Sequence, residues 1–207
     1  MIDKKEIKDF FNKKIQEHGP TPEGLGWNGE EAQNIRFKQI IKVITKKSNF
    51  TINHLGCGYG ALYDELVSHN FSNLQYRGYD ISDEMIKAAK SKCKENNNLN
   101  FSLIDNSSEM LSSDYTVSSG IFNVKMNFSD EDWYQYIIKT LQDMNNHSQL
   151  GFAFNMLTSY SDKEFKREDL YYGDPCHFFD YCKRNFSKNI SLLHDYNLYD
   201  FTIIVRK

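Results

Sequence analysis

The stretch INHLGCGYG, residues 52–60, constrains the fold more than any other part of this chain. Gly56, Gly58 and Gly60 alternate directly after an apolar pair that ends at Leu55. A strand ending there needs a tight turn, which Gly56 permits. Gly58 lets backbone approach a ligand without a Cβ in the way, and Gly60 lets the next helix sit close. The spacing therefore predicts a strand–turn–helix unit that contacts a ligand.

Short apolar runs alternating with helical patterns predict the rest of the fold. We expect strands over 50–55, 74–79, 100–104, 115–122, 151–157, 190–193 and 201–205. Helical patterns cover 61–69, 83–95, 130–145 and 175–186. This order indicates an α/β fold with a doubly wound, seven-stranded, mostly parallel sheet and helices on both faces. The connection HDYNLYD is too short for a crossover, so the last strand is expected to run antiparallel.

Length and composition fit a single globular domain. The chain has 207 residues, of which 40% are hydrophobic and 26% charged, enough for a sizeable core. We divide it into an N-terminal helical cap, residues 1–47, and a Rossmann-like core, residues 48–207. Asp3 with Glu6, and Asn28 with Glu31, have the capping-box spacing and predict the starts of two helices in the cap.

Charge and cysteine usage exclude several classes of protein. The net charge is -3 and lysines are spread among acids, which argues against a nucleic-acid partner. No apolar stretch approaches the roughly 20 residues of a membrane span, and the first residues are too charged for a signal peptide. The four cysteines form no CxxC pair, so we expect reduced thiols and no metal site. A cytoplasmic protein with no membrane partner is expected.

An acid stands at the end of the second expected strand. Asp80, in YRGYD, follows the last glycine of the turn by about twenty residues, where an acid can accept both hydrogen bonds of a ribose diol. The strand, the turn, the helix and this acid together predict a ligand that contains a nucleoside.

The motifs LGCGYG, GYDIS and LIDNSS, with the reversed strand after LLHDY, resemble the class I S-adenosylmethionine-dependent methyltransferases over residues 27–207. The resemblance implies that Asp80 holds the ribose hydroxyls and that Asp105 holds the adenine amine. Ile81 and Ser107 would flank the base, and the glycine loop would face the methionine moiety. The expected reaction transfers a methyl group from S-adenosyl-L-methionine to a small-molecule acceptor, with oxygen as the expected acceptor atom and S-adenosyl-L-homocysteine as product.

The expected cofactor site joins the glycine loop to the ends of neighbouring strands. From these segments it takes Gly56, Cys57, Gly58, Gly60, Asp80, Ile81, Asp105, Asn106, Ser107 and Ser119. Trp27 is expected to close the pocket as a packing anchor. Arg36 shares a helical face with Gln33 and is expected either to pair with the methionine carboxylate or a substrate acid, or to be solvated.

A histidine stands where the family usually has an acid. His54 lies two residues before Gly56, a position from which an acid favours the ammonium of the cofactor. A neutral imidazole brings no negative charge, and a protonated one would repel the cofactor. Either backbone carbonyls and water hold the ammonium with weaker affinity, or the chain binds the cofactor without catalysis. The second hypothesis is a non-catalytic cofactor-binding or partner protein.

Three further segments suggest how an acceptor is bound. Asn123 follows the fourth expected strand, where this fold places the transferring methyl, and is a candidate substrate contact. The loop over 159–174 is long enough for a lid, and its Tyr171 and Tyr172 are candidate substrate residues or packing residues. His194 is expected to emerge at the cofactor edge of the sheet as a general base, or to stabilise a turn.

A nicotinamide dehydrogenase is the main alternative enzyme, because Gly56, Gly58 and Ala61 also fit its fingerprint. The loop would bind no pyrophosphate if Gly60 is the third glycine, and the chain has no room for a substrate domain. The reversed last strand also favours the methyltransferase by resemblance.

Overall fold

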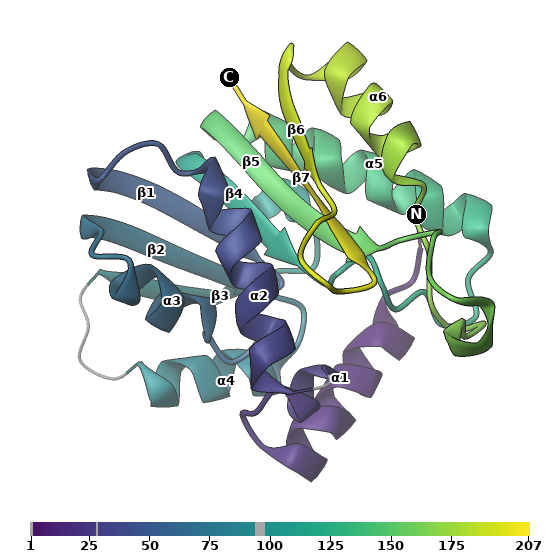
Figure 1. Ribbon diagram of the computed structural model, residues 1–207. Helices are drawn as coiled ribbons and strands as arrows, with labels where there is room; N and C mark the ends of the chain where they lie inside the picture. Colours follow the sequence, from purple (N-terminus) through teal and green to yellow (C-terminus); the bar gives the residue numbers. More distant parts are fainter. Residues whose placement is uncertain (1, 28, 94–97) are drawn as a thin grey trace.

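The computed structural model describes residues 2–27, 29–93 and 98–207. A seven-stranded sheet lies between two layers of helices (Figure 1). The strands are β1 Ser48–Leu55, β2 Ser72–Asp80, β3 Leu99–Leu103, β4 Ser113–Ser119, β5 Ser148–Leu157, β6 Asn189–Leu193 and β7 Asp200–Arg206. The α-helices are α1 Lys5–His18, α2 Glu30–Ile40, α3 Leu62–Ser68, α4 Asp83–Lys92, α5 Asp130–Asn146 and α6 Pro175–Asn185. The expected cap Asn28 and the end of the helix expected over 83–95 lie outside the described residues.

The sheet has the strand order β3-β2-β1-β4-β5-β7-β6. β1 pairs in parallel with both β2 and β4, whereas β7 pairs antiparallel with β5 and with β6. All seven expected strands are therefore confirmed, as is the reversal of the last one. The chain order changes direction between β1 and β4, and open α/β sheets bind ligands beyond the carboxyl ends of the strands at such a point.

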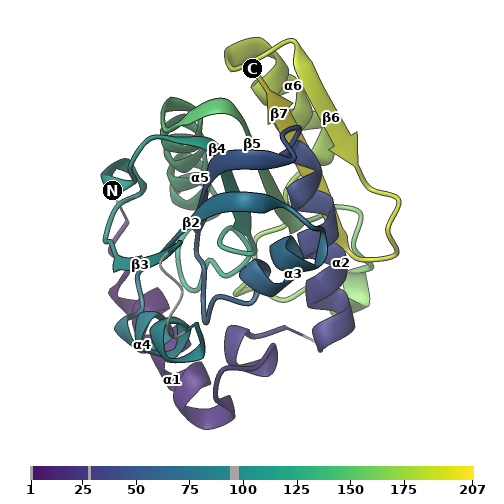
Figure 2. The same ribbon diagram turned by 90° about the vertical axis from the view of Figure 1, so that its left-hand side faces the viewer.

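Two cores fill the space on either side of the sheet. α2, α3 and α4 bury Ile40, Leu66 and Ala89 against one face. α5 and α6 bury Trp133 and Phe178 among the residues of the other face. In Figure 2, α2 and α3 lie to the right of the view and α5 to the left, with strands β1, β2 and β4 between them.

α1 lies across the carboxyl edge of the sheet rather than flat on either face (Figure 1). Its Ile7 belongs to the core on the α5 side. The capping box expected at Asp3 does not form: the helix starts after Lys4, whose side chain makes no cap, and Asp3 accepts the Lys5 N–H at 3.0 Å instead. Within the described ranges, no helix combines the length and the apolar character needed to cross a bilayer.

Candidate functional site

A cleft opens at the carboxyl edge of the sheet, where the chain order reverses. Its empty space is about 850 Å³ when the part open to solvent is included. α1, the glycine loop, the ends of β2, β3 and β4, and α5 supply its walls. The lining residues are Lys4, Ile7, Phe11, Leu25, Trp27, Leu55, Gly56, Asp80, Ile81, Met85, Ile104, Asp105, Asn106, Ser107, Ser119, Gly120, Ile121, Trp133 and Tyr136.

The glycine loop makes the tight turn that its sequence predicts. Gly56 has φ +73°, and a Cβ at this position would lie 2.1 Å from Cγ2 of Ile121. The N–H groups of Gly56 and Cys57 both donate to the Tyr79 carbonyl, at 2.8 and 3.0 Å. The loop after β1 is thus bound to the end of β2, and only glycine fits at its first position.

Asp80 faces the cleft from the end of β2 with both carboxylate oxygens held in place. Oδ2 accepts the Gly58 N–H at 2.8 Å, and Oδ1 accepts the Ser82 N–H at 2.9 Å. Burial raises the pKa of Asp80, although the same backbone hydrogen bonds oppose the shift. Each carboxylate oxygen can accept more than one hydrogen bond, so the group keeps acceptor capacity for two hydroxyls.

The segment after β3 lines the cleft beside Asp80. Asn106 starts a short 3₁₀ turn by a capping box with Glu109, which leaves Asp105 and Asn106 exposed in the cleft. Ser107 also lines the cleft, but its Oγ donates to Asp143 Oδ2 of α5 at 2.7 Å. Ser107 is thus anchored to α5.

α1 and the residue before it form a wall of the cleft that no sequence motif predicted. Lys4 Nζ donates to the Asp105 carbonyl at 2.7 Å and lies 5.2 Å over the Tyr136 ring. Burial lowers the pKa of Lys4. The apolar face of α1, which includes Ile7 and Phe11, was visible in the sequence. The apolar periodicity predicts that this face of the helix packs against other residues, but it does not predict that the face lines a cleft.

Three expected cofactor residues support the glycine loop from outside the cleft lining. Cys57 is buried, and burial raises the pKa of its thiol. A Cβ at Gly58 would lie 2.6 Å from the Leu25 side chain. A Cβ at Gly60 would lie 3.2 Å from the Phe101 ring, so this glycine allows close packing under the loop.

Arg36 is neither in the cleft nor solvated, which revises both expectations for it. Its Nη2 donates to Asp200 Oδ2 at 2.6 Å, and the two side chains are 10% and 0% exposed. Its guanidinium carbon lies 4.2 Å from the centre of the Trp27 ring. Trp27 does line the cleft, so Arg36 touches a wall of the site from behind.

His54 points into the core under α2 instead of lining the cleft. Its Nδ1 is 2.7 Å from the Tyr76 hydroxyl, and the ring makes an edge contact with Phe37. Burial lowers the pKa of His54 to about 3. The imidazole is therefore neutral at physiological pH, and the expected repulsion of a cationic cofactor by a protonated His54 does not arise.

The end of β4 is fixed by buried amides of its neighbours. Ser119 lines the cleft, and its Oγ accepts from Asn155 Nδ2 of β5 at 3.1 Å. Asn123 is buried outside the cleft lining: its Oδ1 accepts the Leu157 N–H at 3.0 Å, and its carbonyl accepts the Tyr171 N–H at 2.8 Å. Asn123 thus ties the turn after β4 to β5 and to the expected lid.

Tyr171 and Tyr172 lie in that loop, away from the cleft-lining residues. Tyr171 packs against the core on the α5 side, and burial raises its pKa to about 12. The Tyr172 hydroxyl accepts the Arg167 N–H at 3.0 Å. The Tyr171 side chain thus packs on the core, the Tyr172 hydroxyl contacts the loop backbone, and neither residue lines the cleft.

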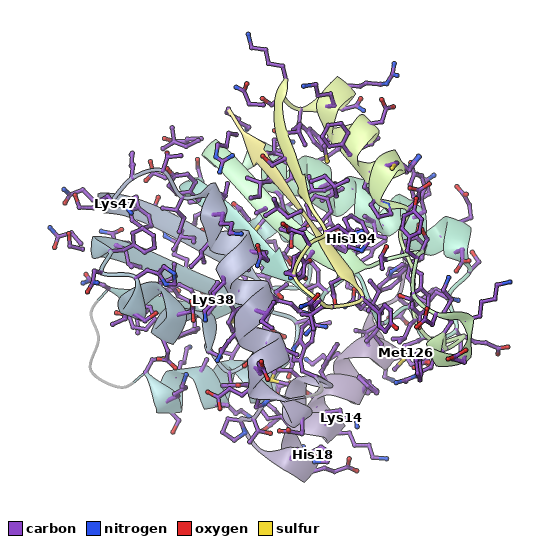
Figure 3. The ribbon with its side chains drawn as sticks, in the orientation of Figure 1. Lys14, His18, Lys38, Lys47, Met126 and His194 are labelled. Atoms are coloured by element: carbon purple, nitrogen blue, oxygen red, sulfur yellow. The ribbon has the colours of Figure 1, made fainter. Side chains whose placement is uncertain are left out.

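His194 follows β6 at the outer edge of the sheet (Figure 3). β6 runs parallel to β1, so His194 does emerge at the carboxyl edge, as expected. Two strands separate β6 from β4, which at the usual strand spacing amounts to about 14 Å. His194 is exposed and packs near Tyr160 and Phe201. The structure does not bring His194 to the cleft, because β5 and β7 lie between β6 and β4. Strand direction predicted the edge at which His194 emerges, but it does not predict the order of the strands.

Comparisons with known proteins agree with this geometry. The family model described as "Methyltransferase domain" matches residues 54–144. A protein of Mycobacterium tuberculosis (strain ATCC 25618 / H37Rv), named "Putative methyltransferase Rv1506c", is 47% identical over 170 residues, covering 81% of this chain and 99% of the relative.

Solved structures share the fold over the whole chain. Magnesium protoporphyrin IX methyltransferase from Synechocystis PCC 6803 with bound SAH has a TM-score of 0.68 at 15% identity, covering 99% of this chain and 100% of that one. Human N-acetylserotonin methyltransferase in complex with SAM has a TM-score of 0.67 at 14% identity, covering 100% of this chain and 60% of that one. At these identities the likeness establishes the shared fold.

Proposed function

The chain belongs to the class I S-adenosylmethionine-dependent methyltransferases, and from that premise we propose that its cleft holds the cofactor with the ribose at Asp80 and methylates a small-molecule acceptor near the end of β4. When bound, S-adenosylmethionine would supply a methyl group on a sulfonium, which an in-line acceptor atom would take up at the methyl carbon as the bond to sulfur breaks and S-adenosylhomocysteine leaves. The protein's own part is to bind, orient and exclude water.

The residues present fit this cofactor. The cleft combines an acid at the end of β2, a second acid at the end of β3 and apolar walls from Ile81, Met85 and Ile104. Those are the groups that a ribose diol, an adenine amine and an adenine ring require. The tight turn at Gly56 brings the glycine loop to the cleft lining, where the Ile121 side chain packs against it.

One observation carries the cofactor assignment. The Asp80 carboxylate is oriented by two backbone N–H groups, one of them from Gly58 in the glycine loop, while the side chain lines the cleft. A carboxylate on the open surface is usually solvated by water and is not held in one orientation by two backbone N–H groups. We therefore assign the ribose hydroxyls to Asp80, the adenine amine to Asp105, and the wall beside the methionine moiety to Trp27.

The distribution of charge in the cleft supports an oxygen acceptor that is ionised before it binds. Among the described lining residues, the ionisable Asp80 and Asp105 end β2 and β3, and Lys4 contacts both the Asp105 carbonyl and the Tyr136 ring. The two carboxylates lie two or three strands from the end of β4, about 10 to 14 Å away at the usual strand spacing, so neither is placed to act as a base there. A carboxylate or an acidic phenol needs no base to attack, whereas an alcohol does. We propose such an acidic oxygen as the acceptor.

Transfer of a labelled methyl group tests this function. The protein is incubated with methyl-labelled S-adenosylmethionine and a panel of aromatic and aliphatic acids, each paired with its corresponding alcohol. We expect label in the acids, with a rate that is independent of pH above the pKa of the acceptor. Label in the alcohols alone, with a rate that rises near pH 6 to 7, would reject the ionised acceptor. Failure of S-adenosylhomocysteine to bind in calorimetry would reject the cofactor assignment itself.

A further inference from the structure

We propose that Arg36 and Asp200, which lie outside the cleft lining, set cofactor affinity by holding the Trp27 indole against Gly120. The pair thus acts as a positioning device for the wall beside the methionine moiety. This inference rests on the proposed function, because it concerns the same cleft.

The position of Trp27 is defined from two sides. On one side the Arg36 guanidinium stacks on the indole, with 4.2 Å between its central carbon and the ring centre. On the other side a Cβ added to Gly120 would lie 2.4 Å from Cζ2 of Trp27. Both Trp27 and Gly120 line the cleft. The indole therefore fills a slot between a cation and a bare stretch of backbone.

Hydrogen bonds hold two of the three guanidinium nitrogens of Arg36, and Nε has no partner among the described residues. Its Nη1 donates to the Ala32 carbonyl, one turn back along α2, at 3.0 Å. Its Nη2 donates to Asp200 Oδ2 at 2.6 Å. Because α2 holds one nitrogen and β7 the other, the guanidinium plane is fixed, and a fixed plane orients the ring that stacks on it.

Asp200 is the fixed end of this arrangement. It starts β7, is paired in register with Leu157 of β5, and its side chain is fully buried. Its Oδ1 has no hydrogen-bond partner among the described residues, so Arg36 is the main compensation for its charge. A buried carboxylate with one strong partner holds that partner tightly.

Gly120 is held as firmly on the opposite side of the indole. Its N–H donates to Asn155 Oδ1 of β5 at 3.0 Å, and its φ is +81°. The slot for Trp27 is thus built from β5, β7 and α2, three elements far apart in the sequence.

Calorimetry with S-adenosylhomocysteine on a double-mutant cycle tests the coupling. Single removal of Arg36 or Asp200 would leave a buried charge unpaired, so both are changed together, as Arg36→Met with Asp200→Asn. We expect this variant to bind about tenfold more weakly, and Trp27→Ala to bind weaker by a similar factor. Combining all three changes should weaken binding no further than Trp27→Ala alone, because the pair acts through the indole.

Tryptophan emission gives a readout that a purely structural role would not move. The chain has two tryptophans, and the other, Trp133, is fully buried. The emission difference between the wild type and Trp27→Ala therefore isolates Trp27. We expect the Arg36→Met, Asp200→Asn variant to shift that emission to longer wavelength as the indole loses its slot.

Gly120→Ala adds a methyl group that would clash with the Trp27 indole, and it leaves the Arg36–Asp200 ion pair unchanged. It should weaken S-adenosylhomocysteine binding when Trp27 is present and have a smaller effect in the Trp27→Ala background, where the added methyl has room. The matched control is Lys46→Met with Asp114→Asn, which removes a 2.7 Å ion pair near the start of β4 and should leave affinity unchanged.

The outcomes separate this inference from the proposed function. If the wild type does not bind S-adenosylhomocysteine, the proposed cofactor site is rejected. If it binds, but loss of the Arg36–Asp200 pair leaves affinity and Trp27 emission unchanged, the positioning role is rejected. The role is also rejected if the pair and Trp27→Ala weaken binding additively.

Discussion

The Asp80 carboxylate accepts the backbone N–H of Gly58 at 2.8 Å, which joins the end of β2 to the glycine loop after β1. The same carboxylate lines the cleft. A single side chain thus orients the loop and presents acceptors to a ligand, so cofactor binding and loop geometry should respond together when it is changed.

Replacing Asp80 tests the ribose contact. Asp80→Asn keeps the shape of the side chain but loses the charge and part of the acceptor capacity. We expect S-adenosylhomocysteine affinity to fall by about 1–3 kcal/mol, the scale for hydrogen bonds to a charged group, measured by calorimetry. Asp114→Asn, at the opposite end of the sheet, serves as the control. An unchanged affinity in Asp80→Asn would remove this residue from the site.

Cofactor affinity should also depend on the ionisation of Asp80. Burial raises the pKa of Asp80 above 3.8, and the ionised form is the better acceptor. Affinity should therefore be full well above the raised pKa and fall as pH decreases through it, earlier than an ordinary aspartate would allow. The test compares pH titrations of S-adenosylhomocysteine affinity in the wild type and Asp80→Asn. The variant should lack this component, and parallel curves would contradict the prediction.

Lys4 should contribute to the same site from α1. Lys4→Met removes the hydrogen bond to the Asp105 carbonyl and the contact over Tyr136. We expect S-adenosylhomocysteine affinity to fall by about 0.5–2 kcal/mol. Lys8→Met, on the same helix, removes the ion pair with Asp83, is not part of the cleft lining and should change affinity little. Equal effects of the two variants would mean that Lys4 only anchors the helix.

His54 should make the fold sensitive to acid without affecting the cofactor directly. Burial lowers its pKa from 6.5 to about 3, so the unfolded chain takes up a proton more readily than the folded one. The free energy of unfolding should therefore not depend on His54 above about pH 6.5. Between pH 6.5 and pH 3 it should fall as the pH falls, by up to about 1.4 kcal/mol per pH unit. Urea unfolding of the wild type and His54→Gln between pH 5 and 7.5 measures the difference in slope. Equal slopes would contradict the burial.

Replacement of His54 by an acid should not tighten cofactor binding. His54→Asp would place a carboxylate between Phe37 and the Tyr76 ring, where burial opposes its charge. We expect a loss of about 1–3 kcal/mol in stability and no gain in S-adenosylhomocysteine affinity. Tyr76→Phe is the matched control, because it removes the hydrogen bond but adds no acid. A clear gain in affinity for His54→Asp would restore the ammonium contact.

His194 should be dispensable for methyl transfer. His194→Ala changes an exposed side chain that follows β6, and two strands, β5 and β7, lie between β6 and β4. Turnover, cofactor affinity and melting temperature should all stay close to those of the wild type, within about 0.5 kcal/mol for stability. A fall in turnover of about 10²-fold or more at unchanged stability would reinstate His194 as a base.

The elements of this fold follow from local sequence. The short HDYNLYD connection requires an antiparallel pair, and the turn at Gly56 requires a residue without a Cβ. Asp80 falls at the end of β2 because the spacing from the glycines is that of one helix and one strand. These features depend on hydrogen-bonding geometry and steric limits over about 30 residues or fewer, which the sequence records directly.

The partners of individual side chains were decided by tertiary structure. Side chains alternate between the two faces of β1, and His54 lies on the face covered by α2. Its ring therefore forms a hydrogen bond with Tyr76. Arg36 meets Asp200 from a strand 164 residues later in the chain. Lys4 reaches the cleft only because α1 crosses the carboxyl edge of the sheet. The sequence by itself determined which residues could form strands and turns, and it predicted Asp80 as the proposed ribose contact. Strand order and the packing of α1 and α2 decided which side chains meet, because those contacts depend on distances across the sheet that no local pattern encodes.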